Sequence, residues 1–255
     1  MQGLSVKKKT MEMENIKTFY RQPKVVEHYA SAAINIGLWV AEENIFTRIF
    51  HSHETILELG CGTGRITMGL YELGYNKLLG IDYSREMIMR ARHMAKILNY
   101  NISFQVGDAT QLNFAKNDYD GAIFGFNGLM QIPSRGNRRL ALSEIYRVLK
   151  PDGLFVFTTH DRELKKGSKF WKKEKLRWDH GKQKTDLLEY GDRYEMTCLG
   201  HSFIHVPTRI EVIEDLKSTG FNVETDVLRK DIANESDQVR QFSDECRFWV
   251  ARKPK

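Results

Sequence analysis

A glycine-rich segment at residues 56–65 constrains the fold of this chain more than any other feature. It reads ILELGCGTGR, an apolar run that ends in three glycines at every second position, Gly60, Gly62 and Gly64. Glycine has no Cβ, so such a loop turns tightly and brings its backbone N–H groups close to a ligand. The amphipathic pattern that follows predicts a helix, whose N-terminus favours a carboxylate or phosphate. The segment therefore predicts a strand, a ligand-binding loop and a helix, although βα loops also use glycine for geometry alone.

Short apolar runs alternate with helical patterns between residues 55 and 159. The expected strands are Ile56–Leu59, Lys77–Ile81, Ile102–Val106, Tyr119–Phe126 and Gly153–Thr158. The expected helices are Arg65–Leu73, Arg85–Leu98 and Gly136–Leu149, the last ending before the turn Pro151-Asp152-Gly153. Strands that alternate with helices imply a parallel sheet with right-handed crossovers. The chain is therefore expected to be a doubly wound α/β protein.

The segments on either side of this region are also patterned. Residues 14–50 carry apolar side chains at helical spacing. Downstream we expect a hairpin between Leu187–Tyr190 and Tyr194–Ile204, a helix at Thr208–Ser218, and strands at Phe221–Leu228 and Arg247–Ala251. Five prolines and the lack of a Gly/Ser linker argue against two freely hinged domains.

The composition is typical of a soluble globular protein. Hydrophobic residues make up 41% and charged residues 28%, and no apolar run approaches the roughly 18 residues of a membrane helix. Lys7, Lys8 and Lys9 are followed by no apolar stretch, so residues 1–10 do not predict a secretory signal. The three cysteines lie far apart and match neither a disulfide framework nor a metal motif. We therefore expect a cytoplasmic protein with no metal and no membrane contact.

The net charge of +6 is concentrated in one segment. Residues 160–185 contain ten Lys or Arg residues and four acidic ones, an excess equal to that of the whole chain. Aromatic residues interleave with the lysines in and just after this segment, namely Phe170, Trp171, Trp178 and Tyr190. The pattern fits a solvated helix face, and it also fits contact with an anionic substrate or a nucleic acid.

Acidic residues follow the second and third predicted strands. Asp82 lies 22 residues after Gly60, where a carboxylate accepts both hydroxyls of a ribose in dinucleotide-binding folds. The alternative role is an N-cap for the next helix, which suits Ser84 better. Asp108 ends the third strand, and there the alternative to ligand binding is a loop cap.

Together these motifs resemble those of class I S-adenosylmethionine-dependent methyltransferases of the small-molecule type with an N-terminal helical lid. The resemblance rests on the glycine loop, Asp82, Gly107-Asp108-Ala109 and the turn at residues 146–153, and it is close over about residues 20–160. It implies a seven-stranded, mostly parallel sheet in the order 3-2-1-4-5-7-6, with the last strand antiparallel. The spacing Gly-x-Gly-x-Gly, in place of Gly-x-Gly-x-x-Gly, favours S-adenosylmethionine over a nicotinamide cofactor.

The resemblance also implies a domain plan. Residues 1–50 would form the lid, residues 51–255 the Rossmann-like domain, and about 161–207 an acceptor-side insertion after strand five.

The resemblance assigns roles within the cofactor site. Gly60, Gly62 and Gly64 would hold the methionine portion, Asp82 the ribose and Asp108 the adenine amino group. The further residues expected at the cofactor are Glu58 (where the family usually has aspartate), Cys61, Arg65, Tyr83, Met87, Ala109, Phe126, Asn127, Tyr29 and Trp39.

Several of these residues have alternative roles. Arg65 pairs with the cofactor carboxylate in one interpretation and forms a surface salt bridge in the other. Tyr20, Tyr29 and Trp39 are candidate lid aromatics whose faces attract a sulfonium, with core packing as the alternative. Core packing is also the alternative for Phe126.

Methyl transfer from a sulfonium is an in-line displacement, so alignment carries much of the catalysis and a base is needed only for a protonated acceptor. The candidate bases are His160, Asp161, His201 and His205, and none of them is assigned as catalytic.

We expect a methyltransferase that acts on a small molecule. One alternative is an RNA methyltransferase that uses the basic, aromatic segment 160–185. Arg138-Arg139 before Glu144 also resembles tRNA wobble-uridine enzymes. The other is a non-catalytic partner protein that binds S-adenosylmethionine. The acceptor and the oligomeric state are left open.

Overall fold

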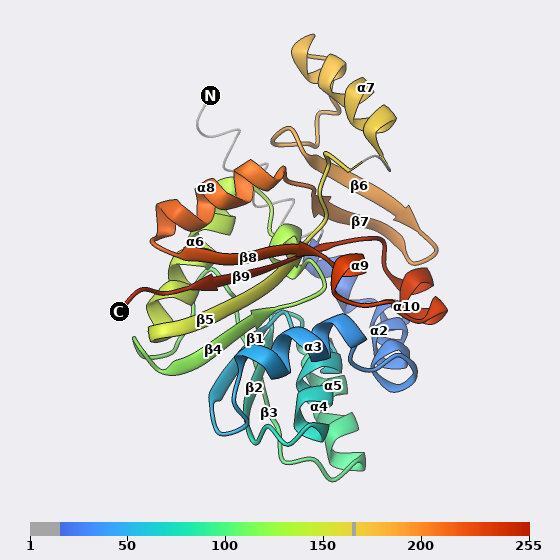
Figure 1. The fold of residues 1–255 in the computed structure, drawn as a ribbon. Helices are drawn as coiled ribbons and strands as arrows, with labels where there is room; N and C mark the ends of the chain where they lie inside the picture. The colour runs from blue at the N-terminus through green and yellow to red at the C-terminus, as the bar shows by residue number, and fades with distance from the viewer. Residues whose placement is uncertain (1–15, 165–166) are drawn as a thin grey trace.

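The computed structural model describes residues 16–164 and 167–255, and its centre is a seven-stranded sheet (Figure 1). The strands of this sheet are β1 (Thr55–Leu59), β2 (Lys77–Asp82), β3 (Ser103–Val106), β4 (Tyr119–Phe124), β5 (Leu149–Thr159), β8 (Asn222–Leu228) and β9 (Arg247–Arg252). Their order is β3-β2-β1-β4-β5-β9-β8. The last strand, β9, runs antiparallel to β5 and β8, whereas β1 to β5 pair in parallel. The predicted strand order and the antiparallel last strand are confirmed.

Helices cover both faces of the sheet (Figure 1). They are α2 (Pro23–Asn35), α3 (Val40–Ile49), α4 (Arg65–Glu72), α5 (Arg85–Ile97), α6 (Arg135–Val148), α7 (Ser168–Asp179), α8 (Arg209–Thr219), α9 (Arg229–Ile232) and α10 (Asp237–Phe242), with a short 3-10 helix η1 (Gly128–Gln131). Because successive side chains of a strand point to opposite faces, the two layers have separate cores. In β1, Ile56 packs with α3 and α4, while Leu57 and Leu59 join the core that contains α6 and α8.

The N-terminal helices lie beside the carboxyl edge of the sheet. Residues 16–21 are helical, and α2 and α3 follow, so the helical pattern predicted for residues 14–50 is confirmed from residue 16 onward. Residues 1–15 lie outside the described part of the chain. Tyr29 and Ala32 of α2 line the same cavity as the glycine loop, which is the position expected of a lid. The division of the chain at residue 50 stays a prediction.

The insertion after β5 consists of α7 and a two-stranded hairpin, β6 (Asp192–Thr197) with β7 (Gly200–His205). The predicted first arm of this hairpin, Leu187–Tyr190, is wrong. Asp192 Oδ2 accepts the backbone N–H groups of Leu188 and Glu189, both at 3.0 Å, which holds those residues in a turn. The hairpin instead runs from Asp192 to His205, and its turn falls inside the predicted second arm, Tyr194–Ile204.

Two further observations concern α7 and the surface. The basic segment is helical over α7, while Lys165 and Lys166 fall outside the described residues. Across residues 16–164 and 167–255, we find no helix that combines the length and the apolar character needed to cross a membrane.

Candidate functional site

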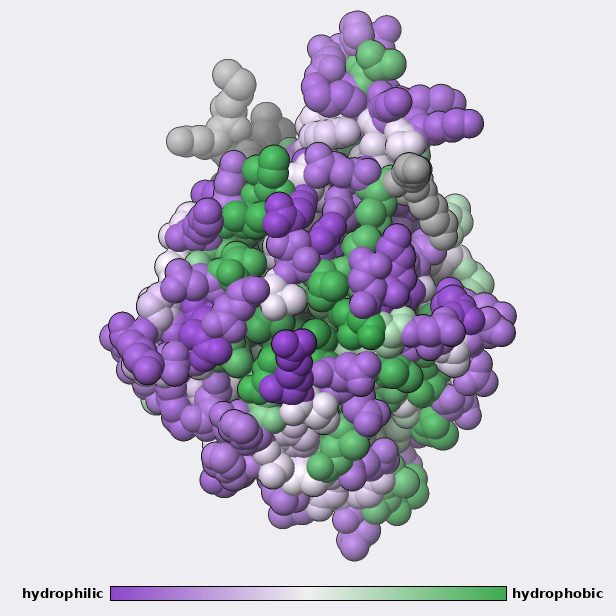
Figure 2. Space-filling model, in the orientation of Figure 1, coloured by the Kyte–Doolittle hydropathy of each residue, from purple (hydrophilic) through white to green (hydrophobic). Residues whose placement is uncertain are grey.

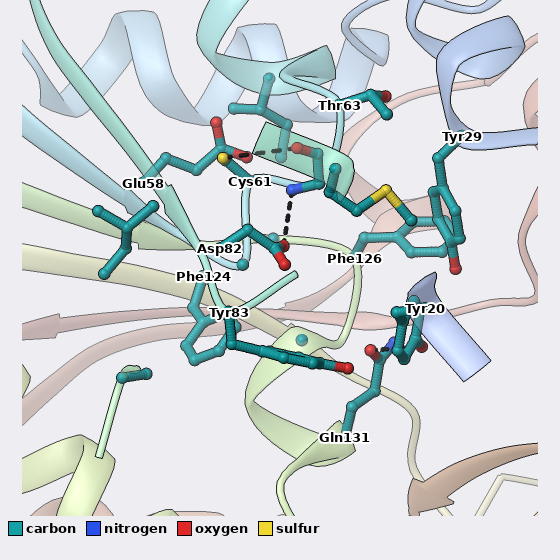
Figure 3. A pocket seen from close by; sticks show the side chains of 18 of the residues that line it. Tyr20, Tyr29, Glu58, Cys61, Thr63, Asp82, Tyr83, Phe124, Phe126 and Gln131 are labelled. Atoms are coloured by element: carbon teal, nitrogen blue, oxygen red, sulfur yellow. Dashed lines mark hydrogen bonds between the residues drawn. The ribbon is translucent and has the colours of Figure 1, made fainter. Parts of the chain in front are cut away.

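A cavity opens at the carboxyl edge of β1, β2 and β4, beneath α2 (Figure 3). All but three of the residues predicted for the cofactor site line it; those that do are Glu58, Gly60, Cys61, Gly62, Arg65, Asp82, Tyr83, Met87, Asp108, Ala109, Phe126 and Tyr29. Gly64, Trp39 and Asn127 lie behind this first layer of residues. The sequence motifs thus converge on one space.

The glycine loop has the left-handed backbone that its composition suggests. Gly60 and Gly62 have φ of 61° and 54°. A Cβ on Gly60 would lie 2.7 Å from Cε2 of Phe124, whereas a Cβ on Gly62 would meet no atom of the described residues within 4 Å. Gly60 is therefore required by packing against β4, and Gly62 keeps part of the cavity open.

Asp82 joins the glycine loop to the start of α5. Its Oδ2 accepts the Gly62 N–H at 2.9 Å and its Oδ1 accepts the Ser84 N–H at 2.8 Å. Ser84, not Asp82, caps α5, since its hydroxyl accepts from Met87 N at 3.3 Å. Burial raises the pKa of Asp82 to about 6, although the two N–H bonds oppose that shift. Each carboxylate oxygen has a second lone pair, so Asp82 can still accept ligand hydroxyls.

Asp108 caps its loop and also lines the cavity. Its Oδ1 accepts the N–H and the hydroxyl of Thr110, at 2.8 and 2.7 Å, so the residue does cap its loop. It also lines the cavity, and its Oδ2 has no hydrogen bond to any described residue. The loop cap fixes the carboxylate while leaving one oxygen for a ligand donor.

The polar end of the cavity is formed by buried groups with few partners of their own. Glu58 is 4% exposed and accepts from the Thr67 hydroxyl, and burial raises its pKa to about 8 while that bond and Arg65 oppose the shift. Thr63 is another residue that lines this cavity, and its Oγ1 is buried without a hydrogen-bond partner among the described residues. Buried polar groups in native proteins are normally satisfied, so Glu58 and Thr63 fit a ligand that carries charged or polar groups.

The raised pKa of Glu58 predicts a pH-dependent stability. Between the ordinary pKa near 4.5 and about 8, the folded state binds more protons than the unfolded state, so the free energy of unfolding falls as pH rises. Glu58→Gln has no such proton to lose and should become more stable than the wild type at pH 8, by on the order of a few kcal/mol. Urea unfolding at pH 5 and pH 8 measures the difference. The control is Glu43→Gln, because Glu43 is exposed. If the free energy of unfolding changed with pH in the same way in the wild type, Glu58→Gln and Glu43→Gln, Glu58 would not be the cause of the pH dependence.

Arg65 is held within the protein. Its guanidinium forms two 2.6 Å hydrogen bonds with the Glu42 carboxylate and donates to the Gly37 carbonyl at 2.8 Å. The Trp39 ring contacts two guanidinium groups, those of Arg65 and Arg229, whose carbons are 4.8 and 5.0 Å from the ring centroid. The ion pair is thus buried rather than on the surface, and Trp39 is a packing residue behind the cavity. A contact between Arg65 and the cofactor stays a prediction.

The end of β4 has an unusual backbone. Phe126 and Asn127 both have positive φ, 49° and 58°, a conformation that non-glycine residues adopt at some energetic cost. The turn directs the Phe126 ring into the cavity, where it lies 6.0 Å from the Tyr29 ring and 5.0 Å from the Phe242 ring, centroid to centroid. Asn127 points away and its Nδ2 lies 3.2 Å from Nε2 of His160.

None of the four candidate bases lines the cavity. His205 is fully buried between Asp192 and Glu211, at 2.8 and 2.7 Å, in the base of the insertion. The Nδ1 of His160 lies 2.9 Å from the Glu245 carbonyl, and Asp161 pairs with Arg247 at 3.2 Å. His201 is exposed on β7. These contacts give His160, Asp161 and His205 structural roles.

The wall opposite the glycine loop is aromatic, with one polar pair. Tyr20 donates to Oε1 of Gln131 at 2.6 Å (Figure 3). Burial raises the pKa of Tyr20 well above its usual range and that of Tyr29 to about 12, so both phenols are neutral near pH 7. This wall combines apolar surface with hydroxyl and amide groups.

Two residues of this wall were missed from the sequence. Gln131 ends η1, which is too short to leave a periodic pattern. Phe242 ends α10, in a segment for which no element was predicted. Ser236 before Asp237 was a usable signal for α10, because its hydroxyl accepts from Val239 N at 3.3 Å as an N-cap.

Comparison with known proteins assigns the chain to a family. The family described as "Methyltransferase domain" matches residues 50–196, more than half of the sequence. The chain belongs to this family. It is 32% identical over 143 residues to the demethylmenaquinone methyltransferase of Symbiobacterium thermophilum, covering 52% of this chain and 55% of that protein. The chain thus spans about half the length of the curated relative it matches.

Solved structures share the fold. A SAM-dependent methyltransferase from Methanosarcina mazei aligns with a TM-score of 0.66 and 22% identity, covering 82% of this chain and 97% of that one. The cyclase SpnF aligns with a TM-score of 0.60 and 18% identity, covering 83% of this chain and 80% of that one. A fold that includes a cyclase does not by itself define the reaction, so the reaction must be argued from the site.

Proposed function

We propose that this protein transfers a methyl group from S-adenosylmethionine to a small, largely apolar acceptor. The observation that carries the proposal is the convergence of the glycine loop, Asp82 and Asp108 on one cavity whose far wall is aromatic. When bound, S-adenosylmethionine supplies an electrophilic methyl group on a sulfonium sulfur.

The residues present fit the parts of this cofactor. The backbone of Gly60 to Gly62 and the unpartnered Thr63 hydroxyl suit the methionine portion. Asp82 suits the ribose hydroxyls, and the free Oδ2 of Asp108 suits an amino group on adenine. Glu58 would ionise beside the amino group of the methionine portion, because a nearby positive charge favours the charged form of a carboxyl.

The protein's part in the reaction is to bind, align and exclude water. Tyr29 and Phe126 present aromatic faces, which attract a sulfonium charge. Tyr20 and Gln131 form the polar pair that can orient an acceptor on the opposite side. Because none of the four candidate bases lines the cavity, we propose an acceptor whose nucleophilic atom needs no histidine to deprotonate it.

The surroundings of Arg138 and of two tryptophans in the insertion favour a metabolite acceptor over RNA. Arg138, which suggested tRNA enzymes, is 1% exposed and donates to Glu189 at 2.8 Å. Trp171 and Trp178 turn inward onto Tyr190, with centroids 5.9 and 6.4 Å apart. Arg139 is exposed, but it is paired with Asp215 at 2.7 Å, so neither arginine of this pair is left free for a phosphate.

Asp82→Ala should weaken binding of S-adenosylhomocysteine by at least about tenfold, because a buried acceptor for two hydroxyls is lost. Calorimetric titration measures the dissociation constant, and thermal unfolding checks that the loop has kept its fold. Asp118→Ala, which removes an exposed carboxylate before β4, is the matched control. Unchanged affinity in Asp82→Ala would show that the ribose lies elsewhere.

The acceptor class is tested by methyl transfer from radiolabelled S-adenosylmethionine to a short-chain naphthohydroquinone, the type of acceptor that the name of the Symbiobacterium relative suggests. We expect labelled product from this probe and none from bulk tRNA. Label in tRNA alone would overturn the acceptor assignment.

A further inference from the structure

Helix α7 projects from the body of the protein on the insertion after β5 (Figure 1). Its inner face is packed, with Trp171 6% exposed against Tyr190 and Glu174 buried. The hairpin of the same insertion packs through Phe203 against Phe19 and Tyr20 beside the cavity. Trp171 therefore attaches the helix to the end of the molecule that carries the proposed site.

The outer face of α7 is a basic stripe formed by Lys169, Lys172, Lys173 and Leu176. These positions are spaced i, i+3, i+4 and i+7, so they lie on one side of the helix, and all four are exposed. The three lysines have no ion-pair or hydrogen-bond partner among the described residues. Figure 2 shows that the helix surface is mostly hydrophilic with a small hydrophobic area.

The stripe is not explained by the stability of the helix. Lysines three and four residues apart repel each other and destabilise a helix slightly, and no acidic residue shares the stripe. The other two cations of α7 are neutralised within the helix, Lys175 by Asp179 and Arg177 by Glu174. A partner of opposite charge would remove the repulsion, so the charge pattern is complementary to an anionic surface.

The apolar side chains on this helix distinguish between anionic partners. Leu176 is 60% exposed and Phe170 is 42% exposed. Single-stranded nucleic acids use exposed aromatic faces for stacking, but Trp171 is buried and Trp178 is half-buried beside Tyr190. The Phe170 ring is covered by Arg193, whose guanidinium carbon lies 5.2 Å from the ring centroid. A helix with lysines around an exposed leucine suits the boundary between lipid headgroups and acyl chains.

We propose that α7 binds, through the basic stripe, to the surface of a membrane that contains anionic lipids. The lysines contact the headgroups and Leu176 enters the acyl boundary. This replaces the expectation that the protein makes no membrane contact. It does not depend on the reaction, so its test is separate from that of the proposed function.

The test is co-sedimentation of the full chain with phosphatidylcholine vesicles, with and without phosphatidylglycerol. We expect binding only to the anionic vesicles and its loss at high salt. The triple variant Lys169→Gln, Lys172→Gln, Lys173→Gln should lose roughly tenfold or more of the partition coefficient. Leu176→Ser should bind more weakly than the wild type.

The matched control removes three exposed lysines elsewhere, Lys96→Gln, Lys217→Gln and Lys230→Gln, and should bind as the wild type does. Equal losses in both triple variants would overturn the proposal, since net charge alone would then explain binding. The proposal would also be overturned if the protein did not bind anionic vesicles. It would be overturned too if bulk tRNA bound the protein more tightly and displaced it fully from the vesicles.

Discussion

Gly62→Ala is expected to weaken S-adenosylhomocysteine binding by at least about tenfold while the protein stays folded. Gly62 lines the cavity, and a Cβ at this position meets no atom within 4 Å in the part of the chain that the structure describes, so the added methyl group enters the space where the proposed ligand would approach the backbone. The positive φ of 54° makes alanine less favourable there by roughly 1–2 kcal/mol. Calorimetry gives the affinity and urea unfolding gives the stability.

Gly181→Ala separates the two effects. Gly181 has a φ of 65° and open space around its Cβ position, but it lies after α7 and away from the cavity. Gly181→Ala should lower the free energy of unfolding about as much as Gly62→Ala does, and it should leave the affinity for S-adenosylhomocysteine unchanged. Gly60→Ala should be more destabilising than either, because its Cβ would lie 2.7 Å from Phe124. Equal affinities for Gly62→Ala and Gly181→Ala would place the ligand away from this loop.

Glu42→Ala is expected to destabilise the protein by about 3–5 kcal/mol, because it leaves the buried guanidinium of Arg65 unpaired. Glu42 is 1% exposed, binds Arg65 through both oxygens, and accepts the Trp39 N–H at 2.9 Å. The pair joins α3 to α4 directly after the glycine loop, so the loss should also weaken cofactor binding.

The control for this prediction is Glu43→Ala, an exposed residue of the same helix, which should cost less than about 0.5 kcal/mol. The double variant Glu42→Ala, Arg65→Ala should be less destabilised than the sum of the single variants, because no unpaired charge remains. Additive effects in urea unfolding would show that the two side chains are not coupled.

The sheet was predictable because its signals are local. The sequence carries an apolar run, three glycines and a capped helix close together. The predicted ends of β1, α4 and α5 therefore agree with the structure to within one or two residues. The order of the strands was not a local property, and it came from the family resemblance.

The parts that were missed depend on contacts between distant residues. Glu42 is an ordinary helix residue in sequence, and only its contact with Arg65 gives it a structural role. Phe242 reaches the cavity by packing on Phe126, more than a hundred positions away. The hairpin boundary was wrong because Asp192 holds a turn through its side chain, a bond that the alternation of apolar residues does not reveal.

The most direct test of the account is calorimetric titration of the purified full chain with S-adenosylmethionine and with S-adenosylhomocysteine. We predict saturable one-to-one binding of both ligands by the wild type, weakened in Gly62→Ala and unchanged in Gly181→Ala. No heat of binding and no thermal stabilisation by either ligand would contradict the assignment of this cavity.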